Sequence, residues 1–348
     1  MNVADLFAGV GGMSEGFKMA GFNISFAVEF DKDIAYAYQQ NHEGTKMFNS
    51  DICQLDVKEL HKEFPDIDVI IGGPPCQGFS QKGKRLSLDD PRNFLFMQYV
   101  RFVKEFKPKY FVLENVPAII TTSKGYFKDQ IVKAFSDLGY DVKYGILSAS
   151  DYGVPQERHR AVFLGQKGKL EIDLPKPNGM HTTIKDAIYD LPFIASGEGT
   201  EVADYDKAPF TEYQKIMRKG SKHLYNHIAT KHNAVALRRL AMLPKGADRE
   251  VLPPEERTKS IYSGTWCRMK EDDISVTITT RYDTPSSGRF THPILDRCIT
   301  TREAARIQSF PDTFRFYGTK TSQMKQVGNA VPPLLAKAIA EVIKNNEL

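Results

Sequence analysis

Residues 2–12 read Asn-Val-Ala-Asp-Leu-Phe-Ala-Gly-Val-Gly-Gly and join a short strand-like run, 2–6, to a stretch with helical character. A glycine turn between a strand and a helix lets backbone amides approach a nucleotide-like ligand. The dinucleotide pattern wants glycine or alanine where Ser14 stands, so a ligand without pyrophosphate fits better. Strand, turn and helix predict the first unit of an α/β fold.

The first half of the chain continues this alternation. Further strands are predicted at 24–28, 69–71, 110–113, 142–147 and 161–164, and helices between them at stretches such as 94–106 and 126–138. The pattern favours a mostly parallel sheet with helices on both faces. Ligands of such sheets bind at the carboxyl ends of the strands. The glycine turn, the segment after 69–71 and the end of 110–113 should therefore meet at one edge.

The character of the sequence changes near residue 174, where prolines and glycines interrupt a region of weak periodicity. We expect a first domain over 1–178 and 326–348, because the apolar helix predicted at 334–343 resembles the first half in composition. The second domain is expected over 179–325. Its predicted elements are a β-like segment at 275–281 and a helix at 301–309, followed by a turn at 328–333.

Composition excludes several classes of protein. The chain has 348 residues, of which 41% are hydrophobic and 26% charged, as in an ordinary soluble enzyme. It has neither a run of about 20 apolar residues nor a secretory signal pattern, so a cytosolic protein is expected. The cysteines, Cys53, Cys76, Cys267 and Cys298, show no pairs at metal-ligand spacing, so we expect reduced thiols and no metal.

Positive charge is concentrated in the second half. Residues 1–178 hold 22 Lys and Arg against 23 Asp and Glu, whereas 179–348 hold 25 against 20. Between 207 and 249 ten basic residues stand against two acids. This stretch favours contact with a polyanion. The alternative is a solvated helix face.

The segment Gly-Gly-Pro-Pro-Cys-Gln-Gly-Phe-Ser, 72–80, places one cysteine at the end of a predicted buried strand. Two prolines restrict the backbone before Cys76, and the glycines permit close approach by another molecule. A reactive thiol held at a sheet edge accounts for this arrangement. The alternative is a small buried core cysteine.

Acidic and basic residues at neighbouring strand ends are further candidates. Glu29 ends a strand twenty residues after Gly9, where an acid can hold ribose hydroxyls, and Asp51 could accept from an adenine amino group. The alternative for such acids is helix capping. Glu114 follows the 110–113 strand, where desolvation would favour its neutral form unless it is ion-paired. Arg158 and Arg160 are expected to point to opposite faces, so that one reaches the site and the other braces the fold.

Four motifs in one order carry a resemblance: Pro-Pro-Cys-Gln at 74–77, Glu-Asn-Val at 114–116, Gln-x-Arg-x-Arg at 156–160 and Gln-Val-Gly-Asn-Ala-Val at 326–331. Through them the chain resembles cytosine carbon-5 DNA methyltransferases of bacterial restriction–modification systems, over 3–178 and about 275–336. The resemblance implies a Rossmann-like methyltransferase fold with a smaller target-recognition domain. It also implies methyl transfer from S-adenosylmethionine to carbon 5 of a cytosine flipped out of a specific duplex DNA site.

The resemblance assigns roles at the catalytic site. Cys76 would be the thiolate that attacks carbon 6, and protonated Glu114 would hold ring nitrogen 3 and the exocyclic amine. Arg158 would hold the base carbonyl and Arg160 would support the site. S-adenosylmethionine contacts are implied for Phe7, Gly9, Gly11, Glu29, Phe30, Asp51, Ile52, Pro75, Leu95, Asn329 and Val331. Family members often have tryptophan where this chain has Phe30, which keeps an aromatic wall.

The implied partner is double-stranded DNA. Residues 77–92 resemble the family's lid, and DNA contacts are expected from Ser80, Lys82, Lys84, Arg85, Arg281 and Arg289. We further expect a monomer in a bacterial or phage-encoded system, with a cognate restriction endonuclease as functional partner. S-adenosylhomocysteine would be the cofactor product.

Three alternatives remain. A transfer RNA cytosine-5 methyltransferase shares the catalytic parts, although that branch typically has phenylalanine and threonine where this chain has Gln77 and Gly78. A nicotinamide-dependent oxidoreductase would explain the glycine turn but neither Cys76 nor the basic stretch. A DNA-binding regulator with an inactive site is opposed by Cys76, Glu114 and Arg158 together.

Overall fold

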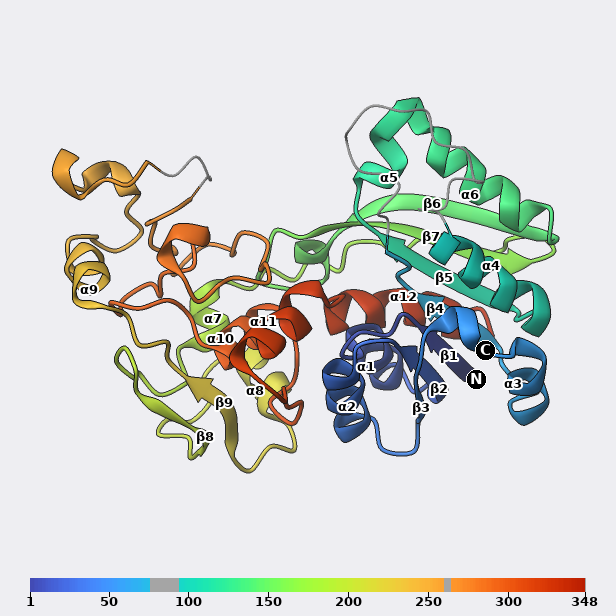
Figure 1. Ribbon diagram of the computed structural model, residues 1–348, viewed down its shortest axis with the longest axis horizontal. Helices are drawn as coiled ribbons and strands as arrows, with labels where there is room; N and C mark the ends of the chain where they lie inside the picture. Colours follow the sequence, from blue (N-terminus) through green and yellow to red (C-terminus); the bar gives the residue numbers. More distant parts are fainter. Residues whose placement is uncertain (76–93, 260–263, 348) are drawn as a thin grey trace. The chain divides into compact units, whose positions relative to one another are not determined.

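The computed structural model describes residues 1–75, 94–259 and 264–347 (Figure 1). The chain divides into two compact units. The first comprises Met1–Ala149, His159–Asn178 and Pro333–Leu348, and the second Ser150–Arg158 and Gly179–Pro332. Residues 150–158 and 326–332, which we expected in the first domain, group with the second unit.

A seven-stranded sheet forms the centre of the first unit, in the order β3-β2-β1-β4-β5-β7-β6. The strands are β1 (Asn2–Leu6), β2 (Asn23–Glu29), β3 (Lys46–Asn49), β4 (Val69–Gly72), β5 (Tyr110–Asn115), β6 (Tyr140–Ser148) and β7 (His159–Lys167). The first five are parallel, and β7 runs antiparallel to both β5 and β6. The predicted α/β class with a mostly parallel sheet is confirmed. Sequence analysis missed β3, which has four residues and no continuous apolar run.

Helices cover both faces of this sheet. Residues from α3 (Val57–Glu63), α4 (Phe94–Phe106) and α6 (Tyr126–Ser136) share a core with Ala4 and Leu6 of β1. The opposite face, toward which Asp5 points, is covered by α1 (Gly12–Met19), α2 (Lys32–Asn41) and α12 (Pro333–Asn345), and a short α5 (Ala118–Thr121) follows β5. No described helix is long and apolar enough to cross a membrane.

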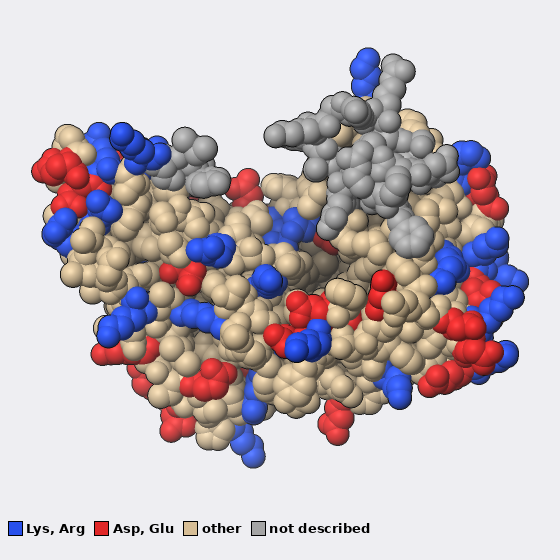
Figure 2. All heavy atoms as spheres, viewed as in Figure 1, with Lys and Arg blue, Asp and Glu red and all other residues tan. Residues whose placement is uncertain are grey.

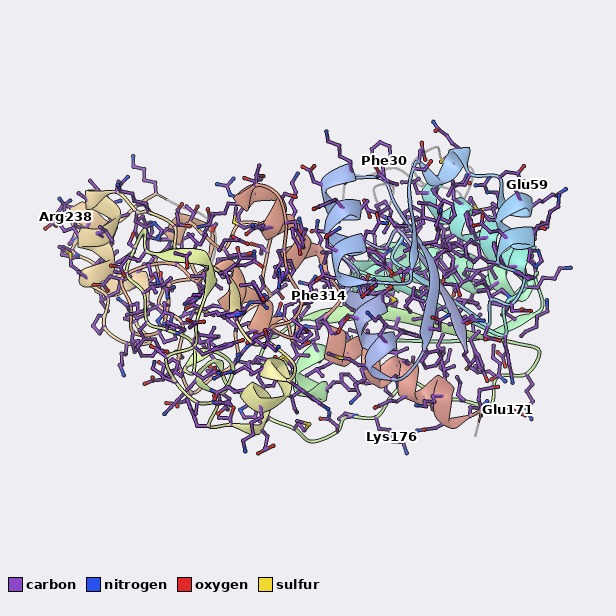
Figure 3. The ribbon with its side chains drawn as sticks, turned by 90° about the horizontal axis from the view of Figure 1, so that it is seen from below. Phe30, Glu59, Glu171, Lys176, Arg238 and Phe314 are labelled. Carbon is purple, nitrogen blue, oxygen red and sulfur yellow. The ribbon has the colours of Figure 1, made fainter. Side chains whose placement is uncertain are left out.

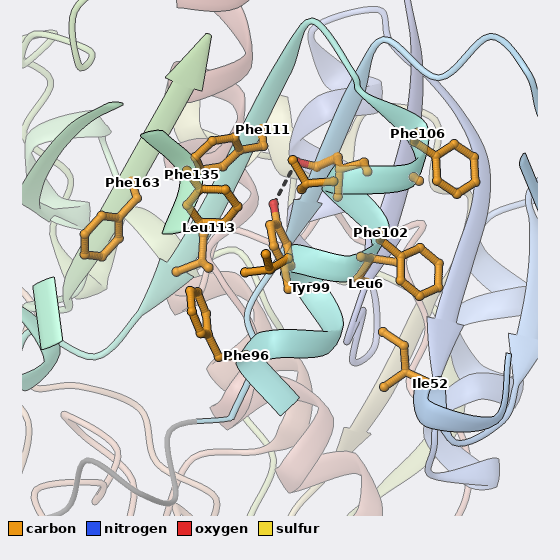
Figure 4. Packing of buried hydrophobic residues seen from close by; sticks show 14 of the residues in the cluster. Leu6, Ile52, Phe96, Tyr99, Phe102, Phe106, Phe111, Leu113, Phe135 and Phe163 are labelled. Carbon is orange, nitrogen blue, oxygen red and sulfur yellow. Dashed lines mark hydrogen bonds between the residues drawn. The ribbon is translucent and has the colours of Figure 1, made fainter. Parts of the chain in front are cut away.

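Aromatic rings fill the core beneath β4 and β5 (Figure 4). The Tyr99 hydroxyl of α4 donates to the carbonyl oxygen of Ile70 at 2.9 Å, and the rings of Phe111 and Phe135 stack with centroids 3.9 Å apart. Burying one such ring contributes roughly 1.5–3 kcal/mol to the free energy of unfolding. This packing makes the sheet a rigid support for groups at its edge.

Strand register brings the predicted loops together. Leu6 pairs with Val28 and Gly72, and Gly72 pairs with Leu113, so β1, β2, β4 and β5 end at one edge. Because β7 is antiparallel to β5, its first residues lie at this edge too, where Asn115 pairs with Ala161. Parallel sheets bind ligands at this edge.

The second unit has little regular structure among its described residues. Its described α-helices and strands are α7 (Ile184–Ile188), β8 (Gly199–Ala203), α8 (Glu212–Arg218), β9 (Leu224–Ile228), α9 (Ala234–Ala241), α10 (Thr301–Ile307) and α11 (Lys320–Asn329). The strand predicted at 275–281 is wrong. Ser275 forms only an isolated bridge to Gln156, and the Ile278 amide donates to the Gln156 side chain, so side-chain bonds replace a strand ladder.

Buried charge pairs hold the second unit together around α10. The guanidinium of Arg306 pairs with Asp312 at 2.6 Å and with Asp190 at 3.1 Å, and all three side chains are fully buried. Arg297 bonds both oxygens of Glu303 at 2.8 Å. Each of these five buried charges thus has a charged partner, which matters because an unpaired charge in a protein interior is strongly destabilising.

Candidate active site at the carboxyl edge of the sheet

The glycine turn after β1 is built from left-handed backbone. Phe7, Gly9 and Gly11 have φ of 57°, 55° and 94°. A Cβ on Gly11 would lie 2.2 Å from Nε2 of His42, so only glycine lets the turn pack against the end of α2. Positive φ is uncommon at a residue such as Phe7 and is often found at functional sites. The turn delivers its chain to the start of α1.

Glu29 ties this turn to the end of β2. Its carboxylate accepts from the Gly9 amide at 2.9 Å and from the Asp31 amide at 2.8 Å. Burial raises the pKa of Glu29, while these backbone donors act in the opposite direction. Phe30 follows with 75% of its surface exposed and lies at the periphery of the first unit (Figure 3). A carboxylate and an accessible aromatic ring thus stand beside the glycine turn.

Other expected cofactor residues have structural roles as well. Asp51 Oδ1 accepts from the Cys53 amide at 2.9 Å, and this backbone hydrogen bond lowers the pKa of Asp51, so it acts as a helix cap. Ile52 is buried in the core, and Leu95 packs against the same core. Asn329 is exposed at the end of α11, in the second unit, where Val331 is buried.

Glu114, in β5, forms an ion pair. Its Oε1 lies 2.6 Å from Nε of Arg160, and both side chains are mostly buried. Its Oε2 lies against the backbone of Gly73, where an added Cβ would come within 2.9 Å. The acid is therefore held between an arginine and the loop that leaves β4. Chemically, a carboxyl fixed in this way can present a polar edge to a planar ligand, with the guanidinium beside it.

Asn115 fastens the same loop, a role that sequence analysis missed. Its Nδ2 donates to the Pro74 carbonyl at 2.9 Å, and its Oδ1 accepts from the Val116 amide at 2.9 Å. Pro74 is buried, whereas Pro75 is exposed. The loop that leads to Cys76 is thus fixed two residues before it. The available signal was an amide side chain directly after a candidate acid at a strand end.

Five predicted residues lie outside the described part of the chain. They are Cys76, Ser80, Lys82, Lys84 and Arg85, together with the expected lid at 77–92. Their roles stay predictions.

The two arginines lie differently from the arrangement that the sequence predicted, and their catalytic roles stay predictions. Arg158 is fully buried in the second unit and donates to the carbonyls of Ile278, Gly328 and Ala330 at 3.1, 2.9 and 2.9 Å. The structure places Arg160, not Arg158, against Glu114. Residues two apart in a strand share a face, so alternation could not separate these side chains. They diverge because β7 begins at His159 and leaves Arg158 outside the strand.

The expected polyanion surface is less basic than the sequence suggests. At least six of the ten basic side chains in 207–249 pair with carboxylates, and Figure 2 shows acidic and basic atoms interspersed on the viewed face. Arg289 is held by Asp248 and donates to the Arg268 carbonyl, whereas Arg281 is exposed. These residues are candidates for DNA contact only where their charge is accessible.

Comparison with known proteins identifies a matching family and similar enzymes. Residues 1–345 match the family described as C-5 cytosine-specific DNA methylase. The chain is 43% identical to the type II methyltransferase M.DdeI of Desulfomicrobium norvegicum, over 99% of this chain and 88% of that one. It is 39% identical to M1.HphI of Haemophilus parahaemolyticus, over 97% and 85% of the two chains.

A solved structure shares the fold along the whole length. It is described as a DNA modification methyltransferase encoded within an Escherichia coli prophage, and it superposes with a TM-score of 0.81 at 31% identity, covering 99% of both chains. The protein is therefore an enzyme of the methyltransferase class. It belongs to the C-5 cytosine-specific DNA methylase family, which confirms the resemblance carried by the four motifs.

Proposed function

We propose that the edge formed by the glycine turn, Glu29 and Phe30 binds S-adenosylmethionine. Each part of the ligand has a chemical counterpart there. Glu29 can accept from the ribose hydroxyls, Phe30 offers a ring for adenine, and the amino terminus of α1 favours the carboxylate of the methionine moiety. When bound, S-adenosylmethionine supplies an electrophilic methyl group on a sulfonium.

The proposed catalytic groups surround Glu114. By family resemblance the Cys76 thiolate adds to carbon 6 of cytosine, which makes carbon 5 nucleophilic toward the methyl group. Glu114 would accept from the exocyclic amine of the base and, once protonated, donate to ring nitrogen 3, and Arg160 would orient Glu114 and reach the base carbonyl. Loss of the carbon-5 proton to a base then expels the thiolate and restores the aromatic ring. Arg158 braces the second unit instead.

The support for this assignment is the Glu114 arrangement. One carboxylate oxygen lies on Arg160, the other lies against Gly73, and Asn115 fixes Pro74 in the same loop. An ion-paired acid used only for stability would not need contact with the loop that leads to the nucleophile. This juxtaposition carries the proposal.

The substrate proposed for the site is a cytosine flipped out of a specific duplex sequence, with the second unit as the target-recognition domain. Relatives named as type II methyltransferases support a restriction–modification role beside an endonuclease that cuts the same sequence. We propose a monomer in the bacterial or phage-infected cytoplasm. Transfer RNA is the alternative substrate, and the family description favours DNA.

Covalent trapping tests the proposal. Duplex DNA containing 5-fluorocytosine at the target should form a denaturation-resistant adduct in the presence of S-adenosylmethionine, because fluorine cannot leave as a proton. Cys76→Ser should form none while still binding DNA and cofactor. Bisulfite mapping of plasmid DNA would first locate the target sequence.

Two outcomes would contradict the proposal. An adduct that persists in Cys76→Ser would remove the thiolate role. Methyl transfer to transfer RNA transcripts but not to any duplex DNA would replace the DNA assignment with the RNA alternative.

A further inference from the structure

An acid lies buried directly beneath the glycine turn. Asp5 is 1% exposed and stands two residues before Phe7, at the carboxyl end of β1. Its Oδ2 accepts from the Ser14 hydroxyl at 2.6 Å, and Ser14 Oγ lies 2.7 Å from the hydroxyl of Tyr38. Ser14 and Tyr38 are also fully buried. A chain of two hydroxyls from α1 and α2 thus ends on a carboxylate.

Burial makes the charge on this carboxylate sensitive to its surroundings. Desolvation raises the pKa of Asp5 to about 7, Ser14 opposes this shift through its hydrogen bond, and the negative charge of Glu29 adds to it. Near neutral pH a small change in local potential therefore changes whether Asp5 carries a proton. A bound cation would favour the charged form.

Of the other titratable groups around Asp5, the histidine and the tyrosines do not change charge near pH 7. Burial and Lys18 lower the pKa of His42 to about 3, so its imidazole is neutral. Burial raises the pKa values of Tyr38 and, on α4, Tyr99 well above their usual range. Glu29 and Glu15 remain, and burial raises the pKa of both.

We propose that Asp5 is a specificity-determining residue for the cofactor, whose ionised carboxylate beneath the turn favours the cationic methyl donor over the uncharged thioether product. This inference rests on the proposed cofactor site. Asp5 acts through space, and Ser14 and Tyr38 position it. Near neutral pH, binding of S-adenosylmethionine would on average release more of the Asp5 proton than binding of S-adenosylhomocysteine.

Such a charge would let the enzyme bind the methyl donor in preference to the product. Product and donor share the adenosine and amino-acid groups, so contacts with those groups cannot discriminate between them. A negative charge near the sulfur can discriminate between donor and product, because only the donor carries a positively charged sulfonium. A fivefold change in the affinity ratio corresponds to about 1 kcal/mol, the size of a screened interaction between two unit charges.

Calorimetric titration of the apoprotein tests this inference. The ratio of dissociation constants for S-adenosylhomocysteine and S-adenosylmethionine should rise about fivefold between about pH 6 and about pH 8, as Asp5 loses its proton. Titrations in two buffers of different ionisation enthalpy count the protons released. The common amino-acid moiety titrates in both ligands, so its contribution largely cancels in the ratio.

Variants separate Asp5 from its neighbours. Asp5→Asn should give a ratio independent of pH, whereas Ser14→Ala, which removes a donor to the charged form, should move the midpoint to higher pH. Glu15→Gln is the matched control on α1 and should keep the wild-type profile. Ser14→Ala also maintains the test if Asp5→Asn does not fold.

The failures are distinguishable. Wild-type protein that binds neither ligand at any pH would overturn the proposed cofactor function itself. Binding of both ligands with a ratio that does not change with pH, or an unchanged profile in Asp5→Asn, would overturn the role of Asp5 alone.

Discussion

Glu114 and Arg160 show how a single pair of residues joins structure to chemistry. Their contact at 2.6 Å holds the carboxyl at the sheet edge, and Gly73 leaves room for its second oxygen. The sequence could predict that Glu114 is a site residue, because burying an acid at a strand end is unfavourable unless it is paired or used in function. The sequence could not predict which of the two arginines contacts Glu114, because that depends on the residue at which β7 begins.

The two arginines should respond differently to truncation. Arg160→Ala should lower kcat by about 10²-fold or more, because it removes an electrostatic contact beside the reacting base. It should also lower the melting temperature, because it removes one partner of a mostly buried ion pair. Arg158→Ala should chiefly destabilise the protein, by a few kcal/mol, since it removes the arginine donor from the buried carbonyls of Ile278 and Gly328, whereas Ala330 still accepts from Gln308. Single-turnover kinetics and thermal unfolding measure both. A stable but inactive Arg158→Ala would reverse our assignment.

At the scale of elements, α1 and α12 pack closely because α1 has a glycine, Gly16, at their contact. A Cβ on Gly16 would lie 2.4 Å from the Pro333 carbonyl oxygen and 2.5 Å from Cβ of Ala336. The helices can approach this closely only because Gly16 is glycine. This contact fastens the last helix of the chain to the helix that begins at the glycine turn.

Gly16→Ala should therefore destabilise the first unit. Glycine to alanine usually favours a helix, but here the methyl group meets backbone atoms that cannot move independently. We expect a loss of about 1–3 kcal/mol, typical of overpacking. Urea unfolding monitored by circular dichroism measures it, with the exposed Lys18→Ala on α1 as control. An unchanged or raised midpoint would show that α12 can shift to accept the methyl group.

Elements differed in how well their sequences predicted them. The strands β1, β4 and β5 follow apolar runs, and β1 is bounded as predicted. The segment 275–281 has equally strand-like residues, but Gln156 and Arg158 take its backbone bonding groups. Local propensity cannot anticipate a partner more than a hundred residues away.

At the scale of the whole molecule, the two units should respond to pH in opposite ways. Burial raises the pKa of Asp5 in the first unit, so ionising this group opposes folding there. In the second unit burial alone would raise the pKa of Glu303, but Arg297 and two histidines hold it well below its usual range, and Asp312 is held low by Arg306. These acids stabilise only while charged.

The expected profile follows from these shifts. The contribution of Asp5 is present below about pH 4 and is lost as pH rises toward 7, whereas the contributions of Glu303 and Asp312 are lost as pH falls below about 4. Relative to wild type, Asp5→Asn should gain up to about 4 kcal/mol of stability between pH 4 and pH 8. Denaturant unfolding of the apoprotein at each pH measures this difference. A constant difference would mean that folding does not raise the pKa of Asp5.

The order of segments along the polypeptide has a consequence for synthesis. Because α12 belongs to the first unit, the ribosome makes everything from Gly179 to Pro332 before that unit can close around α1. A product that ends before Pro333 would lack α12, and with it the packing against Gly16 of α1, the helix that begins at the glycine turn.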